Sequence, residues 1–284
     1  MSDPRENRIL ASGGFKGGGK TYQTYKIIQS YVMPTDGSVS RKVLIFDTNM
    51  EYTNGSVKTS GFSFPIKTIK LEDLATFNKH PRVECCRILP INKDGTLMSI
   101  PQKKETAWGI IQSFRGGLLV LDDINSYVLN VTHEDEFVGA IMNNAHRNAD
   151  IILNFQSVNM INPVLIRNMN VVRLHMQSDQ PQQGKFQEKW ELYIIAWLLV
   201  QHEFNKGGLG EKFCVHVDNL RFKIIGQFSK VDFVRACYKY LNKFNPSAIK
   251  RQQAAIKLIG GKQDNTKAVA EAIKGLFLYY GNPD

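Results

Sequence analysis

The sequence predicts an α/β fold with a mainly parallel central sheet, followed by a β-hairpin and a helical extension. Over the first 175 residues, short apolar strands alternate with amphipathic helical stretches, which is typical of βαβ units. Runs such as Lys42–Phe46 (KVLIF) and Leu118–Leu121 (LLVL) are apolar throughout, as expected of strands covered on both faces. After about Leu174 the alternation stops. The chain has 284 residues, 43% of them hydrophobic, so it can bury a substantial core.

The alternating part contains six expected strands and three expected helices. The strands are Arg8–Ser12, Lys42–Phe46, Arg82–Leu89, Leu118–Leu121, Ile151–Phe155 and Val171–Leu174. The helices are Lys20–Val32, Lys103–Phe114 and Glu134–Arg147. Each helix aligns apolar residues on one face, as Phe137, Ile141 and Ala145 do in the third.

The second part of the chain begins after the polar stretch SDQPQQGKFQ, which predicts a loop. Trp190–Phe204 is apolar on all sides, which favours a buried helix over a strand. Phe213–Val217 and Phe222–Phe228 flank Asp218-Asn219 and predict a hairpin. Three helical stretches end the chain, the first capped by Ser229; the other two are Pro246–Ile259 and Thr266–Tyr280. We therefore expect an α/β core over 1–185, an apolar helix and β-hairpin that extend this core over 186–228, and a basic helical region over 229–284.

Positive charge is concentrated near the C-terminal end. The chain has a net charge of +10, and residues 229–284 hold ten Lys and Arg against four Asp and Glu. This surplus indicates either a solvated helical face or a surface that contacts nucleic acid or an acidic partner. The composition alone does not separate these two interpretations.

Several features favour a soluble protein of a reducing compartment. The spacing of Cys85, Cys86, Cys214 and Cys237 fits neither a disulfide framework nor a zinc ribbon. The first residues, MSDPRENRIL, lack the apolar segment of a secretory signal. The longest apolar run has only nine residues, Leu192 to Val200, whereas a membrane span needs about 20. We therefore expect no membrane span.

The strongest motif is Gly14-Phe15-Lys16-Gly17-Gly18-Gly19-Lys20-Thr21, which fits G-x-x-x-x-G-K-[ST]. It lies between an expected strand and an expected amphipathic helix, the context in which such a loop binds phosphate. Glycines let the backbone wrap an anion, and the amides at the helix N-terminus point at it. Lys20 is expected to reach the β- and γ-phosphates of ATP, and Thr21 to bind Mg²⁺. The candidate nucleotide-binding residues are Gly14, Phe15, Lys16, Gly17, Gly18, Gly19, Lys20, Thr21 and Tyr22.

Two carboxylates follow the buried strand Gly117-Leu-Leu-Val-Leu, about 100 residues after this loop. The carboxyl ends of strands are where α/β sheets bind ligands. We expect Asp122 to bind Mg²⁺ and Asp123 to polarise the attacking water. A simple Asp-Asp turn is the alternative. The next strand ends at Gln156, which is either a sensor of the γ-phosphate or an ordinary polar strand end.

With these motifs in place, residues 8–175 resemble the HerA/FtsK superfamily of RecA-like P-loop motor ATPases. The more specific features are Asp47-Thr-Asn-Met-Glu51-Tyr52, similar to the D-x-x-x-E-[YF] element of that group, and the strand ending in Gln156, with Ile166-Arg167-Asn168 and Val171-Val172-Arg173-Leu174 after it. The resemblance implies site roles for Lys20, Thr21, Asp122, Asp123 and Gln156, and an undefined role for Glu51. The superfamily usually has Glu where this chain has Asp123.

Motors of this group act as rings, in which an arginine of one subunit completes the next subunit's site. The resemblance thus implies a homo-oligomeric ring, pentameric or hexameric. Arg147 is the first candidate for this arginine, followed by Arg167 and Arg173.

The scale of the chain is similar to that of viral genome-packaging ATPases, and its organisation to that of Zot-like phage assembly ATPases. We therefore expect an ATP-driven motor that translocates nucleic acid, most simply DNA, independently of its sequence. Two alternatives remain open: an assembly or extrusion motor that acts on coat proteins, and a non-motor nucleotide-binding module. The expected cofactors are ATP and Mg²⁺. The expected partners are nucleic acid and capsid or membrane proteins of a virion, and the expected location is the host cytoplasm or the virion.

Overall fold

The computed structural model describes residues 8–128, 135–207, 212–258 and 264–283. Its centre is a ten-stranded mixed sheet in the order β10-β9-β8-β7-β1-β6-β5-β2-β4-β3. The strands are β1 (Ile9–Gly13), β2 (Lys42–Phe46), β3 (Ile66–Thr68), β4 (Cys85–Ile88), β5 (Gly117–Leu121), β6 (Ala149–Phe155), β7 (Val171–His175), β8 (Cys214–Asp218), β9 (Lys223–Gly226) and β10 (Gly281–Pro283). Neighbouring strands from β3 to β7 are all parallel, whereas β7-β8 and β8-β9 are antiparallel and β10 is parallel to β9.

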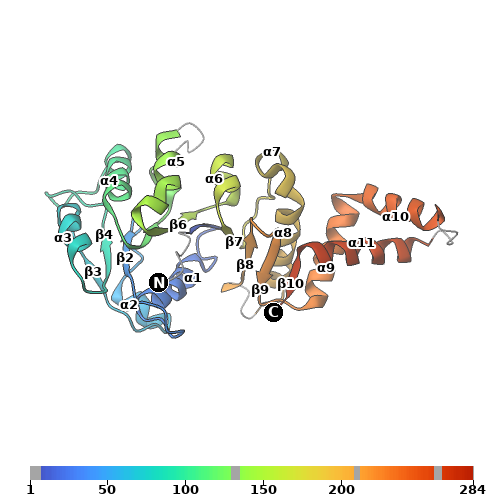
Figure 1. Ribbon diagram of the computed structural model, residues 1–284, viewed down its shortest axis with the longest axis horizontal. Helices are drawn as coiled ribbons and strands as arrows, with labels where there is room; N and C mark the ends of the chain where they lie inside the picture. Colours follow the sequence, from blue (N-terminus) through green and yellow to red (C-terminus); the bar gives the residue numbers. More distant parts are fainter. Residues whose placement is uncertain (1–7, 129–134, 208–211, 259–263, 284) are drawn as a thin grey trace.

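Helices cover both faces of the sheet (Figure 1). The helices in chain order are α1 (Lys20–Val32), α2 (Asn54–Thr59), α3 (Leu74–Lys79), α4 (Ile100–Ser113), α5 (Asp135–Met142), α6 (Pro163–Asn168), α7 (Gln183–Phe186), α8 (Trp190–Asn205), α9 (Lys230–Lys243), α10 (Pro246–Leu258) and α11 (Asn265–Tyr280). On one face, Tyr25 and Ile28 of α1 and Val57 of α2 pack on the sheet in a small apolar cluster. On the other face, α3 to α6, α8 and α9 share one larger core with the sheet. The α/β prediction is therefore confirmed.

Most of the expected elements form within a few residues of their expected bounds. The strands at Lys42–Phe46 and 171–175, the helix Lys20–Val32 and the β8-β9 hairpin lie where the sequence indicates. The stretch from Trp190 is a helix, α8, whose apolar residues are almost all buried. Ser229 caps α9, its side chain accepting a hydrogen bond from the Asp232 amide.

One expected helix is shorter than the sequence indicates. The expectation ran from Glu134, which lies outside the described residues, to Arg147. In the structure α5 ends at Met142 and a 3-10 turn covers Asn143–Arg147. The change of helix type begins at Asn143, and asparagine disfavours helix interiors because its side chain competes for backbone hydrogen bonds. The end of this turn is held by the Gly116 amide, which donates to the Arg147 carbonyl (3.0 Å).

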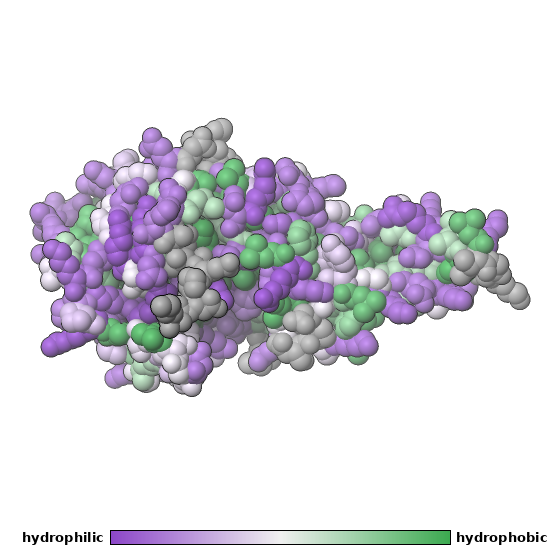
Figure 2. Space-filling model, viewed as in Figure 1, coloured by the Kyte–Doolittle hydropathy of each residue, from purple (hydrophilic) through white to green (hydrophobic). Residues whose placement is uncertain are grey.

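Helices α10 and α11 form a hairpin that projects from α9, away from the sheet (Figure 1). The exposed surface of this arm is mixed in hydropathy (Figure 2). Leu258 (87% exposed), Leu278 (68%) and Tyr279 (60%) stand among exposed lysines such as Lys250 and Lys274. Across the described residues, no helix is both long enough and apolar enough to cross a membrane.

Candidate nucleotide-binding and hydrolysis site

A cavity of about 540 Å³ lies at the carboxyl edge of the parallel strands. It is lined by Lys16, Gly17, Gly19, Lys20, Thr21, Tyr22, Asn49, Glu51, Asp122, Asp123 and Gln156. The structure thus brings together the glycine loop after β1 and the polar ends of β2, β5 and β6. These strands are neighbours in the sheet, so residues more than 100 positions apart share one site.

The glycine loop is fixed to the end of β7. The Phe15 amide donates to the Met176 carbonyl (3.0 Å), and Nδ1 of His175 lies 2.8 Å from the Gly18 carbonyl. Gly14 is packed so closely that a Cβ there would lie 2.5 Å from Cβ of His175. Burial holds the pKa of His175 well below its ordinary value. A neutral imidazole therefore donates from Nδ1 to the loop carbonyl.

Helix α1 begins directly under the cavity. Gly19, the residue before the helix, has φ of 81°, a left-handed conformation that glycine adopts without strain. The amides of the first turn consequently face the cavity, where an anion is favoured by their free N–H groups and by the helix dipole. Lys20 Nζ donates to the Gly14 carbonyl (2.6 Å) and the Phe15 carbonyl (2.9 Å). Burial lowers the pKa of Lys20, and Asp122, Asp123 and Glu51 oppose that shift.

Asp122 is buried with one of its carboxylate oxygens unpaired. Its Oδ1 accepts from Nδ2 of Asn154 (3.0 Å) and from the hydroxyl of Tyr52 (3.4 Å). Its Oδ2 is inaccessible to solvent and has no hydrogen-bond partner. Burial raises the pKa of Asp122 to about 7, against the Asn154 hydrogen bond, and the charges of Glu51, Asp47 and Asp123 add to the rise. A positive charge beside Oδ2 would oppose this rise.

The residues around this oxygen fit Mg²⁺. The Thr21 hydroxyl, at the start of α1, donates to Oε2 of Glu51 (3.1 Å). Hydroxyl and carboxylate oxygens are the ligands that Mg²⁺ takes beside a nucleotide phosphate. Thr21 and Asp122 both line the cavity, so a hydroxyl and a carboxylate of this kind are available in one site.

Asp123 is held in an unusual backbone conformation. Its φ of 42° and ψ of 55° are left-handed, which is uncommon for a residue with a side chain. Its carboxylate accepts from Nε2 of Gln156 (3.0 and 3.3 Å) and from Nδ2 of Asn49 (3.4 Å). Asp123 and Gln156 thus share a hydrogen bond at the cavity wall, a geometry that can hold a water molecule beside a phosphate.

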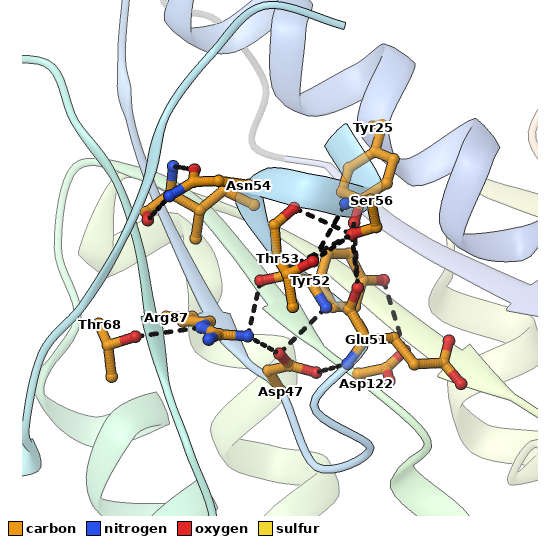
Figure 3. A network of polar contacts seen from close by, with 11 residues as sticks. Tyr25, Asp47, Glu51, Tyr52, Thr53, Asn54, Ser56, Thr68, Arg87 and Asp122 are labelled. Carbon is orange, nitrogen blue, oxygen red and sulfur yellow. Dashed lines mark hydrogen bonds and ion pairs between the residues drawn. The ribbon is translucent and has the colours of Figure 1, made fainter. Parts of the chain in front are cut away.

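The segment after β2 is pinned by a buried ion pair (Figure 3). Asp47 is completely buried and binds Nη1 of Arg87 (2.9 Å). Its oxygens also accept from the backbone amides of Glu51 (2.9 Å) and Tyr52 (3.1 Å). Burial raises the pKa of Asp47, and these hydrogen bonds oppose that shift. Because Asp47 binds the backbone of both residues, it fixes where the side chain of Glu51 enters the cavity.

The arginine candidates do not line the cavity. Arg147 precedes β6, at the opposite edge of the sheet, and donates to the Ala140 carbonyl (2.6 Å). Arg167 is exposed at the end of α6. Arg173 is 1% exposed and donates to Oγ of Ser12 (3.3 Å) and Oγ1 of Thr24 (3.1 Å). A side chain enclosed between β1 and α1 cannot reach a neighbouring subunit, so the expectation for Arg173 is wrong.

Sequence reasoning missed Asn154 and His175, and it named Tyr52 only as part of a motif. One signal was present for Asn154, since an amide interrupts the otherwise apolar run Ile151–Phe155. His175 carried no such signal, because it is the register of β7 beside β1 that places it under the loop.

The fold and the site together define an α/β RecA-like P-loop NTPase fold. No family model and no curated sequence matches the chain. Solved structures that align with it include the genome packaging NTPase B204 of Sulfolobus turreted icosahedral virus 2 in complex with AMP, at 14% identity and a TM-score of 0.47, covering 78% of this chain and 96% of that chain. The DNA-packaging ATPase B204 of Sulfolobus turreted icosahedral virus aligns at 13% identity and a TM-score of 0.44, covering 79% and 97%. The N-terminal domain of zonular occludens toxin from Neisseria meningitidis aligns at 11% identity and a TM-score of 0.30, covering 64% and 90%.

Proposed function

We propose that this chain is an ATPase whose hydrolysis drives movement of nucleic acid, in the setting of viral genome packaging. The observation that carries the ATPase part is the unpaired, buried Oδ2 of Asp122, a residue that lines the same cavity as Thr21. A buried carboxylate oxygen without a donor is costly unless a cation completes it. A nucleotide that arrives with Mg²⁺ supplies that cation together with the anion that the glycine loop is built to bind.

The residues then divide the work as follows. The loop amides and Lys20 hold the β- and γ-phosphates, while Thr21 and Asp122 hold the metal, which neutralises charge on the phosphates. Asp123 accepts a hydrogen bond from the attacking water and orients it, and Gln156 fixes Asp123 in turn. Glu51 is a second carboxylate at the cavity, beside Thr21. A neighbouring subunit in a ring contributes an arginine, for which Arg147 and Arg167 are the proposed candidates.

The nucleic-acid part of the proposal is supported by the charge of the arm and of α9. Their described basic residues, all exposed, outnumber the acidic ones; they include Arg235, Lys239, Lys243, Lys250, Arg251, Lys257, Lys267 and Lys274. Such a surface binds phosphate backbones without reading sequence. The exposed apolar side chains of the arm, Leu258 and Tyr279 among them, favour the second candidate, an assembly motor that acts on coat proteins.

The test of hydrolysis is the ATPase rate of the wild type and of Lys20→Ala. Loss of the phosphate-binding ammonium is expected to lower kcat/KM by about 100-fold or more, the effect of removing one strong donor from a reacting oxyanion. Lys58→Ala, an exposed lysine of α2 outside the cavity, is the matched control and is expected to match the wild type. Equal rates for Lys20→Ala and the wild type contradict the proposal.

To test whether nucleic acid is the transported polymer, the ATPase rate is measured with double-stranded DNA at low and at high salt. DNA is expected to stimulate the wild type, and stimulation is expected to fall steeply with salt. The charge reversals Lys250→Glu and Lys274→Glu in the arm are expected to weaken stimulation, whereas Lys58→Glu and Lys79→Glu on the core are not. Stimulation by capsid protein and none by DNA favours the assembly motor instead.

A further inference from the structure

Two buried side chains from different parts of the sheet, Tyr52 and Asn154, meet at the buried carboxylate of Asp122. Tyr52 follows β2, Asp122 follows β5 and Asn154 lies in β6; their exposures are 0%, 5% and 0%. The Tyr52 hydroxyl and Nδ2 of Asn154 both reach Oδ1 of Asp122, at 3.4 and 3.0 Å. Nδ2 of Asn154 also lies 3.2 Å from the Tyr52 oxygen. The donors of this cluster, the Tyr52 hydroxyl and Nδ2 of Asn154, therefore both bind Oδ1 of Asp122, and neither binds Oδ2.

What the cluster leaves open is only acceptor capacity. Oδ2 of Asp122 and Oδ1 of Asn154 are both buried and without a partner. A group of side chains that served packing alone would complete its hydrogen bonds, because an unmade bond in the interior is destabilising. These two unpaired acceptors belong to side chains that bind each other, and Asp122 lines the cavity, which is the arrangement that a cation, or water bound to a cation, would complete.

A second buried Tyr–Asn pair shows the difference. The Tyr193 hydroxyl donates to Oδ1 of Asn219 (3.0 Å), and Nδ2 of Asn219 donates to the Ile166 carbonyl (3.0 Å). Each side-chain polar atom of that pair has a partner, and no carboxylate is involved. The pair joins α8 to the turn after β8 and completes its hydrogen bonds within the protein.

We propose that Tyr52 and Asn154 are positioning residues for the metal site: by binding Oδ1 they fix the orientation of Asp122, so that Oδ2 faces the divalent cation of the bound nucleotide. The inference rests on the proposed function, since it assumes that the cavity binds a nucleotide with its metal. It adds two residues that touch neither substrate nor metal and act only through Asp122.

The position of Tyr52 is itself fixed by its surroundings. Asp47 binds its amide (3.1 Å), and Nη1 of Arg87 donates to its carbonyl (2.8 Å). The Tyr25 ring packs edge-on against the Tyr52 ring, with 5.4 Å between the centroids. In Figure 3 the Asp47–Arg87 pair and Asp122 lie on either side of this tyrosine. The hydroxyl therefore has little freedom to leave Asp122, which is what a positioning role requires.

The experiment separates metal affinity from nucleotide affinity in the full chain. Mn²⁺ affinity is measured by the electron paramagnetic resonance of free Mn²⁺ with a non-hydrolysable ATP analogue present. Affinity for the analogue is measured separately in EDTA. Tyr52→Phe and Asn154→Ala are each expected to weaken Mn²⁺ binding about fivefold, the usual effect of one buried hydrogen bond. Analogue affinity in EDTA is expected to change less than twofold, because the phosphates bind through the glycine loop.

Tyr193→Phe and Asn219→Ala are the matched controls and are expected to leave both affinities unchanged. A melting curve checks folding, and Tyr52→Phe keeps the proposal testable if Asn154→Ala is unstable, because it removes one oxygen and keeps the ring. In an Asp122→Asn background, Tyr52→Phe is expected to lose its effect on Mn²⁺.

Three results are decisive against the proposal. Unchanged Mn²⁺ affinity in Tyr52→Phe overturns it, and so does an equal loss of analogue affinity in EDTA, or an effect that persists in Asp122→Asn. Wild-type protein that binds no analogue at all would instead overturn the proposed function, and the positioning role with it.

Discussion

Two clusters of ionisable side chains in this molecule are arranged in opposite ways. At the carboxyl edge of the sheet, Asp122, Asp123 and Glu51 surround one cavity with Lys20, and a buried oxygen of Asp122 has no partner. Between α8 and α9, Asp232 binds Lys206 Nζ (2.6 Å), His202 Nε2 (3.1 Å) and the Ser229 hydroxyl. The first cluster has unused acceptors, whereas the second is closed.

The pKa values of the two aspartates reflect this difference. Burial raises the pKa of Asp122 to about 7, and the negative charges of Glu51, Asp47 and Asp123 add to the rise. Burial acts in the same direction on Asp232, but its hydrogen bonds from Lys206 and Ser229 and the charge of Lys206 outweigh it and hold the pKa of Asp232 below its usual range. His202, Glu203 and Asp232 lie close enough to resemble a metal site, yet Lys206 already supplies the positive charge there. The two clusters therefore differ in charge balance, as the proposed binding of a nucleotide at the first cluster requires.

Neutralising Asp123 is the strongest test of the functional role that we propose for the cavity cluster. Asp123→Asn keeps the shape of the side chain but removes its negative charge and replaces one acceptor oxygen by an NH₂ donor, so that it can no longer take a proton from water. We expect kcat for ATP hydrolysis to fall by about 10²- to 10⁴-fold, the range for a general base, with nucleotide affinity nearly unchanged. The measurement is steady-state hydrolysis together with the binding of a fluorescent analogue.

Glu51→Gln is the matched comparison, since it removes the charge of the other free carboxylate at the cavity. A large loss of kcat in Glu51→Gln with near-normal turnover in Asp123→Asn would assign the base to Glu51. That outcome contradicts the role proposed for Asp123 and leaves the cavity as the site.

Parts of the site that are formed by residues close together in the sequence could be predicted, whereas contacts between distant residues could not. The glycine loop, Asp122-Asp123 and the Gln156 strand end are local patterns, and the structure places all of them at one cavity. The bounds of α1 and β2 were also predictable, because a periodic run or a short apolar run defines each.

The Tyr52–Asp122–Asn154 cluster could not be predicted. It exists because β2, β5 and β6 are neighbours in the sheet, an order that no local pattern encodes. Short elements such as α2 and β3 were missed for a related reason. Helices of one or two turns depend on tertiary contacts rather than on their own propensity. Asn54, for example, begins α2 and binds both the amide and the carbonyl of Ile66 in β3.

The balanced cluster predicts a change in stability without a change in chemistry. Asp232→Asn removes the buried charge that pairs with Lys206, which keeps its ion pair with Glu203, and we expect it to reduce stability by about 1 to 2 kcal/mol, or about 2 to 6 °C in Tm. We expect kcat per folded molecule to stay at the wild-type level, because the cluster lies outside the cavity. Calorimetry and the hydrolysis assay check the two halves. A large loss of kcat at full occupancy of the folded state would show that α8 and α9 participate in the reaction.

We expect acid to lower Tm by a smaller amount. This change tests whether a buried, neutral histidine elsewhere in the sheet makes the stability of the protein depend on pH. His216 in β8 lies opposite Arg173 in β7. Burial, with the charge of Arg173, lowers the pKa of His216 to about 4. The folded pKa is below the unfolded value of about 6.5, so the unfolded chain binds the proton first. This contribution to stability is complete above about pH 6.5 and is lost as the pH falls toward 4.

We expect the Tm of the wild type to fall between about pH 6.5 and about pH 4. When each protein is compared with its own Tm at pH 7, we expect the Tm of His216→Gln to fall less than that of the wild type. His80→Gln, at a half-buried histidine after α3, serves as the control. An unchanged slope in His216→Gln would show that the neutral imidazole contributes nothing, and that the acid sensitivity of the sheet resides in other groups, of which buried His175 is the first to test.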